Sequence, residues 1–562
     1  MATAVSVLGG IGLFLLGMTI MTDGLRGLAG SSLRTVLGKA AATPMSGALW
    51  GALVTLLVQS SSATTMTTIG LVSAGLLTFP QGLGLVFGAN VGTTGTGWLV
   101  ALIGVRVSLS TYALPMIFIG ALAKLMGKGR LAAAGASLAG FALVLYGLTT
   151  LQQGMGGVAS QLRPEDLPAV LGMPEVGWLP GLLGLLALVA IGAIMTTVMQ
   201  SSTAAIAVTL SAFYAGAIGL EQGCALIIGQ NIGTATSSAM AAIGASATAK
   251  RLALAYILFK VIAALIAIVS FPFVMPLVRR GAEHLDGVSL LAAYHTAFNV
   301  VGVAVLMPAI NRFTRFVEKL LPDTSSPLTR ALDPAAHENP VVAVEAVRRT
   351  IALAIQAIGP KIIAAIGGDA SATGALSLAE PLAALREARD FIADITLAPE
   401  TESEDRRLTS TLHALDHMTR LAEAAGEEPD FPLAREGEDE QHAAQLCAEA
   451  LRAAMAAVDD IAREAAFGAD RAAIEVLETP AAGAALERLE DGARQLGQLK
   501  RAHRAPTLRR VATGEINAEQ ALGRIETVRR LESLARHAWR AVAHLLGDAE
   551  APAQVDLARM SS

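Results

Sequence analysis

The chain has 562 residues, a mean hydropathy of +0.54 and hydrophobic residues at 53% of positions, with aromatic residues at only 4%. This aliphatic, glycine-rich composition is typical of a membrane protein, and two cysteines do not indicate a disulfide framework. The net charge of −5 is unevenly distributed: positions 1–320 contain sixteen Lys and Arg against eight Asp and Glu, and the remainder contains 26 against 39. The two parts are therefore predicted to lie in different solvents.

Apolar stretches of about 17 to 25 residues, the length that crosses a bilayer, are expected only up to Ile310. They lie near 5–21, 46–75, 82–103, 109–125, 131–151, 178–219, 224–243, 252–275 and 290–310. The stretch 46–75 is long enough for one bent helix or for a re-entrant hairpin. The first stretch has no basic region before it, so we expect a retained helix rather than a cleaved signal peptide.

A repeat joins the two halves of this apolar region. The sequence QSSTAAI at 200–206 follows QSSSATT at 59–65 by 141 positions, and the same offset pairs GQNIGTA at 229–235 with GANVGTT at 88–94. Upstream, GLFLLGMTIMTDGLRGLAG resembles FALVLYGLTTLQQGMGGVA at an offset of 130. Duplicated halves are common in secondary transporters, whose sites form at the repeat interface near the bilayer midplane.

Glutamine and hydroxyl side chains in both halves predict an ion pathway. Hydroxyls in membrane helices often bond the carbonyl one turn back, and the asparagines at 90 and 231 could be helix-packing contacts, so packing is the alternative interpretation. The duplication favours a site, because neutral oxygens suit sodium and helix N-termini suit anions. Neither motif contains Lys or Arg. We therefore expect a bound dianion to need co-bound cations, since each uncompensated charge costs about 2.3 kcal/mol per 100 mV.

With these motifs the chain resembles the type II sodium/phosphate cotransporter family in its bacterial form, through GLFLLGMTIMTDGL, the paired motifs above and HTAFN at 295–299. The resemblance implies an inverted-repeat carrier that couples sodium entry to uptake of inorganic phosphate, with sodium as coupling ion and no cofactor. No nucleophile elbow, Walker loop or zinc spacing is found, so an enzyme is not expected.

The resemblance also assigns the substrate and sodium site, with no catalytic residue and no metal beyond transported sodium. The assigned residues are Gln59, Ser60, Ser61, Ser62, Thr64, Asn90, Thr93, Gln200, Ser201, Ser202, Thr203, Asn231 and Thr234. Ala204, Ala205 and Ile206 stand where the first half has Ala63, Thr64 and Thr65, so the second half is expected to offer fewer oxygens. His295 and Asn299 are interpreted equally as packing partners or site residues, and no acidic residue is assigned to sodium.

A proline- and serine-containing linker at 321–340 precedes segments that are rich in Ala and Leu and have polar faces. The segments 341–365, 376–397, 408–425, 441–466 and 518–546 predict an amphipathic helical bundle. ALDHMTRLAEAA and IETVRRLESLARHAWRAVAHL resemble the PhoU-like domains that are appended to bacterial family members. Asp416 is kept from the paired acidic motif of those domains, but Thr419 is not acidic, so metal binding is not expected. We expect this domain to have a regulatory or assembly role.

The predicted fold is all-α: a polytopic carrier domain with two inverted repeats and broken or re-entrant helices, followed by a soluble helical bundle. The boundaries are 1–320 for the carrier (repeats at about 5–125 and 131–310), 321–340 for the linker, 341–550 for the PhoU-like domain and 551–562 for a tail. Arg312, Arg315 and Lys319 predict a cytoplasmic C-terminus. The family resemblance implies that the membrane is a bacterial inner membrane.

The expected partners are phosphate, sodium and the lipid bilayer, and no nucleic acid is expected. Whether the protein forms a homo-oligomer is left open. Two other functions compete with the sodium-coupled carrier. One is a membrane-anchored phosphate sensor, and the other is a carrier or exporter of phosphate or another small oxyanion.

Overall fold

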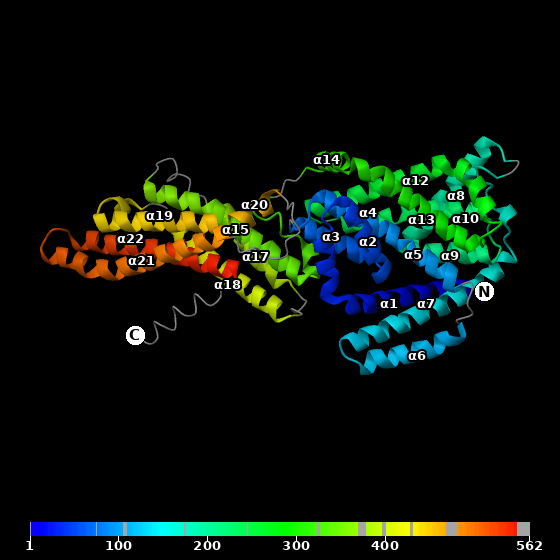
Figure 1. Ribbon diagram of the computed structural model, residues 1–562, viewed down its shortest axis with the longest axis horizontal. Helices are drawn as coiled ribbons and strands as arrows, with labels where there is room; N and C mark the ends of the chain where they lie inside the picture. Colours follow the sequence, from blue (N-terminus) through cyan, green and yellow to red (C-terminus); the bar gives the residue numbers. More distant parts are fainter. Residues whose placement is uncertain are drawn as a thin grey trace. The chain divides into compact units, whose positions relative to one another are not determined.

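The computed structural model describes residues 2–74, 76–104, 110–173, 176–243, 245–322, 326–368, 378–395, 401–427, 431–467 and 480–547. Within these ranges the chain is almost entirely helical and contains no strand (Figure 1), which confirms the all-α class. Backbone contacts divide it into unit 1 (Met1–Ile69 and Phe79–Asp323) and unit 2 (Gly70–Thr78 and Thr324–Ser562). The predicted start of the fourth apolar stretch at 109 and the predicted tail 551–562 lie outside the described residues.

The helices up to Leu320 follow the order of the predicted apolar stretches, and the end of α3, from Gly70, is grouped with unit 2. They are α1 (Ala2–Ala40), α2 (Pro44–Val58), α3 (Ser61–Ser73), α4 (Phe79–Thr93), α5 (Gly95–Leu99), η1 (Val100–Gly104), α6 (Ser110–Met126), α7 (Arg130–Ala159), η2 (Pro164–Asp166), α8 (Trp178–Met199), α9 (Ser202–Tyr214), α10 (Leu220–Gly233), α11 (Ala235–Ala241), α12 (Ala247–Gly281), α13 (Gly287–Leu306), η3 (Met307–Ala309) and α14 (Ile310–Leu320).

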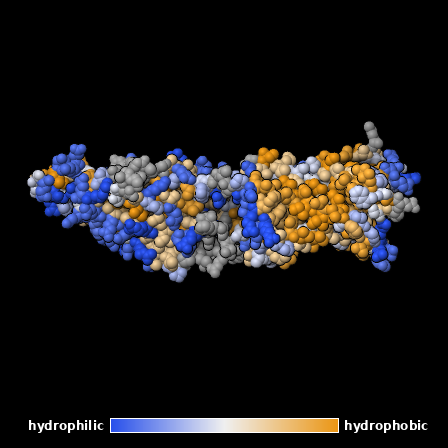
Figure 2. Space-filling model, turned by 90° about the horizontal axis from the view of Figure 1, so that it is seen from above, coloured by the Kyte–Doolittle hydropathy of each residue, from blue (hydrophilic) through white to orange (hydrophobic). Residues whose placement is uncertain are grey.

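Seven helices in the described ranges are long and apolar enough to cross a membrane, which confirms a multi-pass membrane protein. Figure 2 shows hydrophobic side chains gathered on the surface of unit 1. Leu49, Phe118 and Leu183 are among the large apolar side chains exposed there. Because exposed apolar surface of this extent is unfavourable in water, this face fits contact with lipid.

The expectation that no membrane-length segment follows Ile310 was wrong. Helix α15 (Pro340–Gly367), in unit 2, meets the criteria of length and composition. It packs against α17 (Ala379–Ala393), α18 (Glu402–Glu427), α19 (Glu438–Ala457) and α20 (Asp459–Phe467). A helix covered by other helices on several sides is apolar around most of its circumference whether or not lipid surrounds it.

Two helix breaks lie at the duplicated glutamines. Among the described non-glycine residues, Gln59 and Gln200 have left-handed backbone conformations, with φ of 58° and 51°. The hydroxyls of Thr55 and Thr64, nine positions apart, are 2.9 Å from each other. Since nine residues of continuous helix would span about 13 Å, the chain turns back at Gln59. The stretch 46–75 therefore forms two helices joined by a tight turn, not one bent helix.

Matched glycines let the helices of each half approach closely. Helix α2 packs on α4, and α8 packs on α10. A Cβ atom added at Gly88 would overlap the carbonyl oxygen of Ala48, and one added at Gly229 would overlap that of Val189. Each pair in the second half follows its equivalent in the first half at the repeat offset. The repeat offset found in the sequence thus corresponds to the same backbone contact in both halves.

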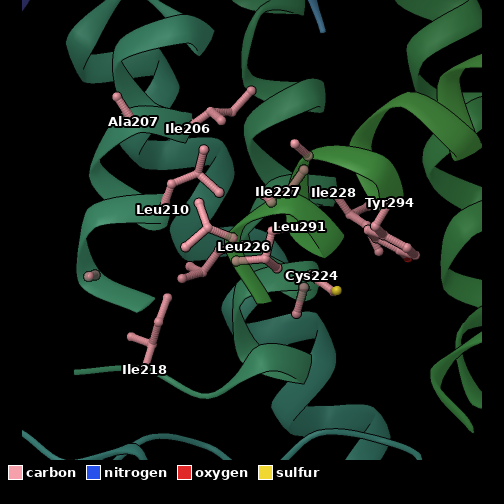
Figure 3. Packing of buried hydrophobic residues seen from close by; sticks show 14 of the residues in the cluster. Ile206, Ala207, Leu210, Ile218, Cys224, Leu226, Ile227, Ile228, Leu291 and Tyr294 are labelled. Carbon is pink, nitrogen blue, oxygen red and sulfur yellow. The ribbon is translucent and has the colours of Figure 1, made fainter. Parts of the chain in front are cut away.

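A buried apolar cluster fixes the helices of the second half to α13. Ile206 and Leu210 from α9, Leu226 and Ile228 from α10, and Leu291 from α13 belong to this cluster (Figure 3). These side chains are each no more than 7% exposed. The cluster holds α10 against α13, which sets the positions of the polar residues on those two helices.

The helices of unit 2 not yet named are η4 (Pro334–Glu338), η5 (Pro432–Arg435), α21 (Pro480–Ala512) and α22 (Ala518–Leu546). Helix α22 packs against α18, α19 and α21. Helix α21 was missing from the predicted helices. Its apolar stripe includes Ala482, Ala485, Leu489 and Leu496, which are buried, but mostly small residues and many charges between them weaken the sequence pattern.

Candidate functional site

A cavity of about 510 Å³ in unit 1 is lined by both glutamine-serine motifs and both asparagine motifs. The predicted site residues that line it are Gln59, Ser60, Ser61, Ser62, Asn90, Thr93, Gln200, Ser201, Ser202, Thr203, Asn231 and Thr234. The remaining predicted residue, Thr64, does not line this cavity. Its side chain is buried behind the motif and is bonded to Thr55.

The two glutamines have the same hydrogen bonds in each half. The Gln59 Nε2 group donates to the Leu56 carbonyl at 2.5 Å, and Oε1 accepts from Thr96 at 2.7 Å. The Gln200 side chain donates to the Thr197 carbonyl at 2.6 Å and accepts from Ser237 at 2.9 Å. Each amide therefore satisfies a carbonyl that the end of the preceding helix leaves unpaired, which stabilises the left-handed turn.

The serines after each glutamine cap the next helix. Ser60 Oγ accepts from the backbone N–H of Ala63 at 3.2 Å, and Ser201 Oγ accepts from that of Ala204 at 3.2 Å. The N-termini of α3 and α9 thus begin at the cavity wall. A helix N-terminus carries partial positive charge and free N–H groups, so both starts are suited to an anion.

The second half lacks one cavity hydroxyl, as expected, because Thr65 lines the cavity and its counterpart Ile206 does not. The departure at Ala205 has a different consequence. In the first half Thr55 bonds to Thr64. Thr196 is the equivalent of Thr55, and its hydroxyl is buried without a hydrogen-bond partner among the described residues. Because Thr64 itself lies outside the cavity, the substitution changes the packing behind the second motif and leaves the cavity lining as it is.

Three asparagines meet where the halves join. The Asn90 and Asn231 side-chain amides both donate to Asn299 Oδ1. The distance from Asn231 Nδ2 to Asn299 Oδ1 is 3.3 Å. Asn299 in turn donates to the His295 carbonyl at 2.7 Å. His295 lines the cavity, and its buried Nδ1 has no hydrogen-bond partner within the described ranges. The HTAFN segment therefore supplies a cavity residue and a packing residue, one helical turn apart.

Three charged residues of the cavity were missed in the sequence. Arg26 and Asp23 line it from α1 and Lys260 lines it from α12. Arg26 donates to Ser60 Oγ at 2.8 Å, and Lys260 is 1% exposed. Positive charge at the cavity is therefore supplied by helices outside the motifs, in addition to any co-bound cation. A lysine within the apolar stretch 252–275 was a signal for this, since intramembrane charges are usually functional.

A helical membrane unit whose two halves contribute matched polar segments to one cavity has the architecture of a secondary transporter. The comparison with protein families agrees. The family model for the Na+/Pi-cotransporter matches residues 13–153 and 184–291, so unit 1 is similar to that family over most of its length.

Relatives match different lengths of the chain. YqeW of Bacillus subtilis is 28% identical over 311 residues, which is 55% of this chain and 95% of that protein. YjbB of Escherichia coli K12, whose name assigns it provisionally to inorganic phosphate export, is 30% identical over 358 residues, or 62% of this chain and 63% of that protein. The chain thus spans less than two thirds of the length of YjbB.

A shorter match reaches a mammalian protein. The sodium-dependent phosphate transport protein 2A of Oryctolagus cuniculus is 44% identical over 61 residues, which cover 11% of this chain and 10% of that protein. No solved structure matches the chain.

Proposed function

We propose that this protein carries inorganic phosphate across a bacterial inner membrane together with sodium, and that its C-terminal helices form a cytoplasmic regulatory domain. The match to the Na+/Pi-cotransporter family model and the phosphate-related names of two relatives support the substrate. The observation that carries the proposal is the meeting of both glutamine-serine motifs at one cavity that Arg26 and Lys260 also line.

Each part of phosphate and sodium recognition has a candidate group in this cavity. The helix N-termini at Ser61 and Ser202 and the guanidinium of Arg26 would bind phosphate oxygens. The side-chain oxygens of Gln59 and Gln200, with the carboxylate of Asp23, offer hard oxygen ligands of the kind that sodium prefers.

Sodium coupling is expected because the negative charge of phosphate is costly to move across the membrane. The cationic side chains help to bind an anion, but they do not travel across the membrane with it. Inward movement of each negative charge therefore costs about 2.3 kcal/mol per 100 mV of inside-negative potential. Sodium ions that move together with the anion remove this cost and add the energy of their own gradient.

The test is radiolabelled phosphate uptake into proteoliposomes with and without an inward sodium gradient. Gln59→Ala and Gln200→Ala should abolish gradient-driven accumulation, because each variant loses the turn that positions a motif. Gln81→Ala and Gln222→Ala are matched controls, since these glutamines are also related by the repeat offset but bond to loop carbonyls of Ala42 and Pro164 outside the cavity lining. They should retain uptake.

Two results would reject this function. If oriented protein binds phosphate but never accumulates it with sodium, the sensor takes its place. Loss of uptake that is equal in the cavity variants and in the control variants would instead remove the motifs from the site.

Export is the second candidate, and the name of YjbB favours it. An inside-negative potential drives anions outward, so export of phosphate needs no sodium. The distinguishing measurement is efflux from phosphate-loaded vesicles under an inside-negative potassium diffusion potential. Efflux that is rapid in sodium-free buffer, with no accumulation under an inward sodium gradient, would establish export.

A further inference from the structure

The ammonium group of Lys260 lies between equivalent residues of the two halves. Its Nζ atom donates to Asn90 Oδ1 at 2.7 Å and to Asn231 Oδ1 at 3.0 Å. Asn90 and Asn231 are related by the repeat offset, so one side chain from α12 contacts the same atom type in both repeats. The ring of Tyr256 lies 4.6 Å from the ammonium, measured to its centroid.

The amide orientations form a consistent network that directs oxygen atoms toward Lys260. Asn299 donates to the His295 carbonyl, which can only accept, so its own Oδ1 must face the other two asparagines. Asn90 and Asn231 then donate to that oxygen and present their Oδ1 atoms to the lysine. A pair of converging neutral oxygens next to a cavity is a usual environment for a monovalent cation.

No carboxylate compensates this charge within the described residues. Lys260 is 1% exposed and forms no ion pair there. A buried cation held only by neutral groups is costly unless an anion approaches it. Since Lys260 also lines the cavity, an anion in the cavity would supply that compensation.

We infer that the Lys260 ammonium occupies a monovalent-cation site shared by the two halves and acts as a tethered counter-charge for the bound anion. The inference rests on the proposed function for the identity of that anion. Lys260 thereby takes the place of one sodium ion. The site would need that ion if the side chain at position 260 were uncharged. Lys260 sets how many sodium ions accompany phosphate binding, and it makes the anion site selective for a charged substrate.

The experiment compares the purified full chain with Lys260→Ala, which vacates the site, and with Lys260→Met, which fills it without charge. Lys250→Ala removes an exposed lysine of the same helix and is the control. Radioactive sodium binding is measured without phosphate, and phosphate binding is measured at low and high sodium. Thermal unfolding of each variant checks the fold.

Lys260→Ala should bind one more sodium ion than the parent, whereas Lys260→Met and Lys250→Ala should not. At low sodium both Lys260 variants should bind phosphate at least about tenfold more weakly, because a charge-assisted contact is lost. High sodium should restore phosphate binding to Lys260→Ala and not to Lys260→Met. A lysine that only stabilises the packing would not give this difference.

The inference fails if Lys260→Ala binds no additional sodium, or if Lys260→Met keeps the phosphate affinity of the parent. The second result decides the question even if Lys260→Ala does not fold. Failure of the proposed function has a different signature: the parent would bind no phosphate, while Lys260→Ala would still gain its sodium ion.

Discussion

The packing of the two glutamine-serine motifs differs by one hydrogen bond between hydroxyl groups. Thr55 and Thr196 occupy equivalent buried positions, but only Thr55 has a hydrogen-bond partner among the described residues. The cause is one substitution, because Ala205 replaces the partner residue Thr64. A hydroxyl buried without a partner costs free energy, whereas a paired one contributes to stability.

We predict that Thr55→Val lowers the free energy of unfolding by about 0.5–1.5 kcal/mol, because it removes the hydrogen bond to Thr64 and leaves the Thr64 hydroxyl only its 3.3 Å contact with the Ser60 carbonyl. The matched variant Thr196→Val should change stability by less than about 0.5 kcal/mol or increase it. Thermal unfolding in one detergent measures both. An equal decrease in the two variants would mean that the Thr196 hydroxyl has a partner after all.

At the scale of helices, the two halves depend on close backbone contact between α8 and α10 and between α2 and α4. We predict that Gly229→Ala destabilises the membrane unit by about 1–3 kcal/mol, since the added methyl group meets the backbone of Val189. Gly12→Ala on α1 is the control, because nothing lies within 4 Å of its added Cβ atom. Unfolding temperatures measure the difference, and equal values would contradict the close contact.

Helices α18 and α22 meet through a set of histidines. The Nδ1 atoms of His417 and His537 are 3.2 Å apart. Burial is the largest cause that lowers the pKa of each to about 4, and nearby cations add to it: His537 and Arg540 for His417, and Arg536, Arg420 and Arg540 for His537. Asp416 opposes the shift in both cases, and His413 and His544 stack beside them.

This cluster predicts acid sensitivity of the α18–α22 contact. Because the folded pKa lies below the unfolded value of about 6.5, the stability is fully present above pH 6.5 and is lost as the pH falls toward 4. Hydrogen exchange of the amides of α18 and α22 in the full chain should accelerate over this range. The double variant His417→Gln/His537→Gln should flatten the response, while His442→Gln should not. An unchanged profile in the double variant would exclude the cluster as the cause.

For the molecule as a whole, the site residues that could be predicted from the sequence are those that occur in both halves. The repeat offset alone pairs Gln59 with Gln200 and Asn90 with Asn231. All four residues line one cavity. Arg26, Asp23 and Lys260 were missed because no equivalent residue marks them: at the repeat offset before Lys260 stands Ile119. Helix α21 was missed for another reason, since its many charges obscure its apolar stripe.

The single copy of Lys260 constrains how such a protein can be built. If two identical half-length chains formed this cavity, symmetry would place two ammonium groups on opposite sides of the axis, next to the same asparagine oxygens. At about 4 Å their repulsion would be about 4 kcal/mol even at an effective dielectric constant of about 20. A central lysine is therefore compatible only with unlike halves. Joining the halves in one chain guarantees that each assembled cavity receives one lysine, and it leaves the motifs free to diverge.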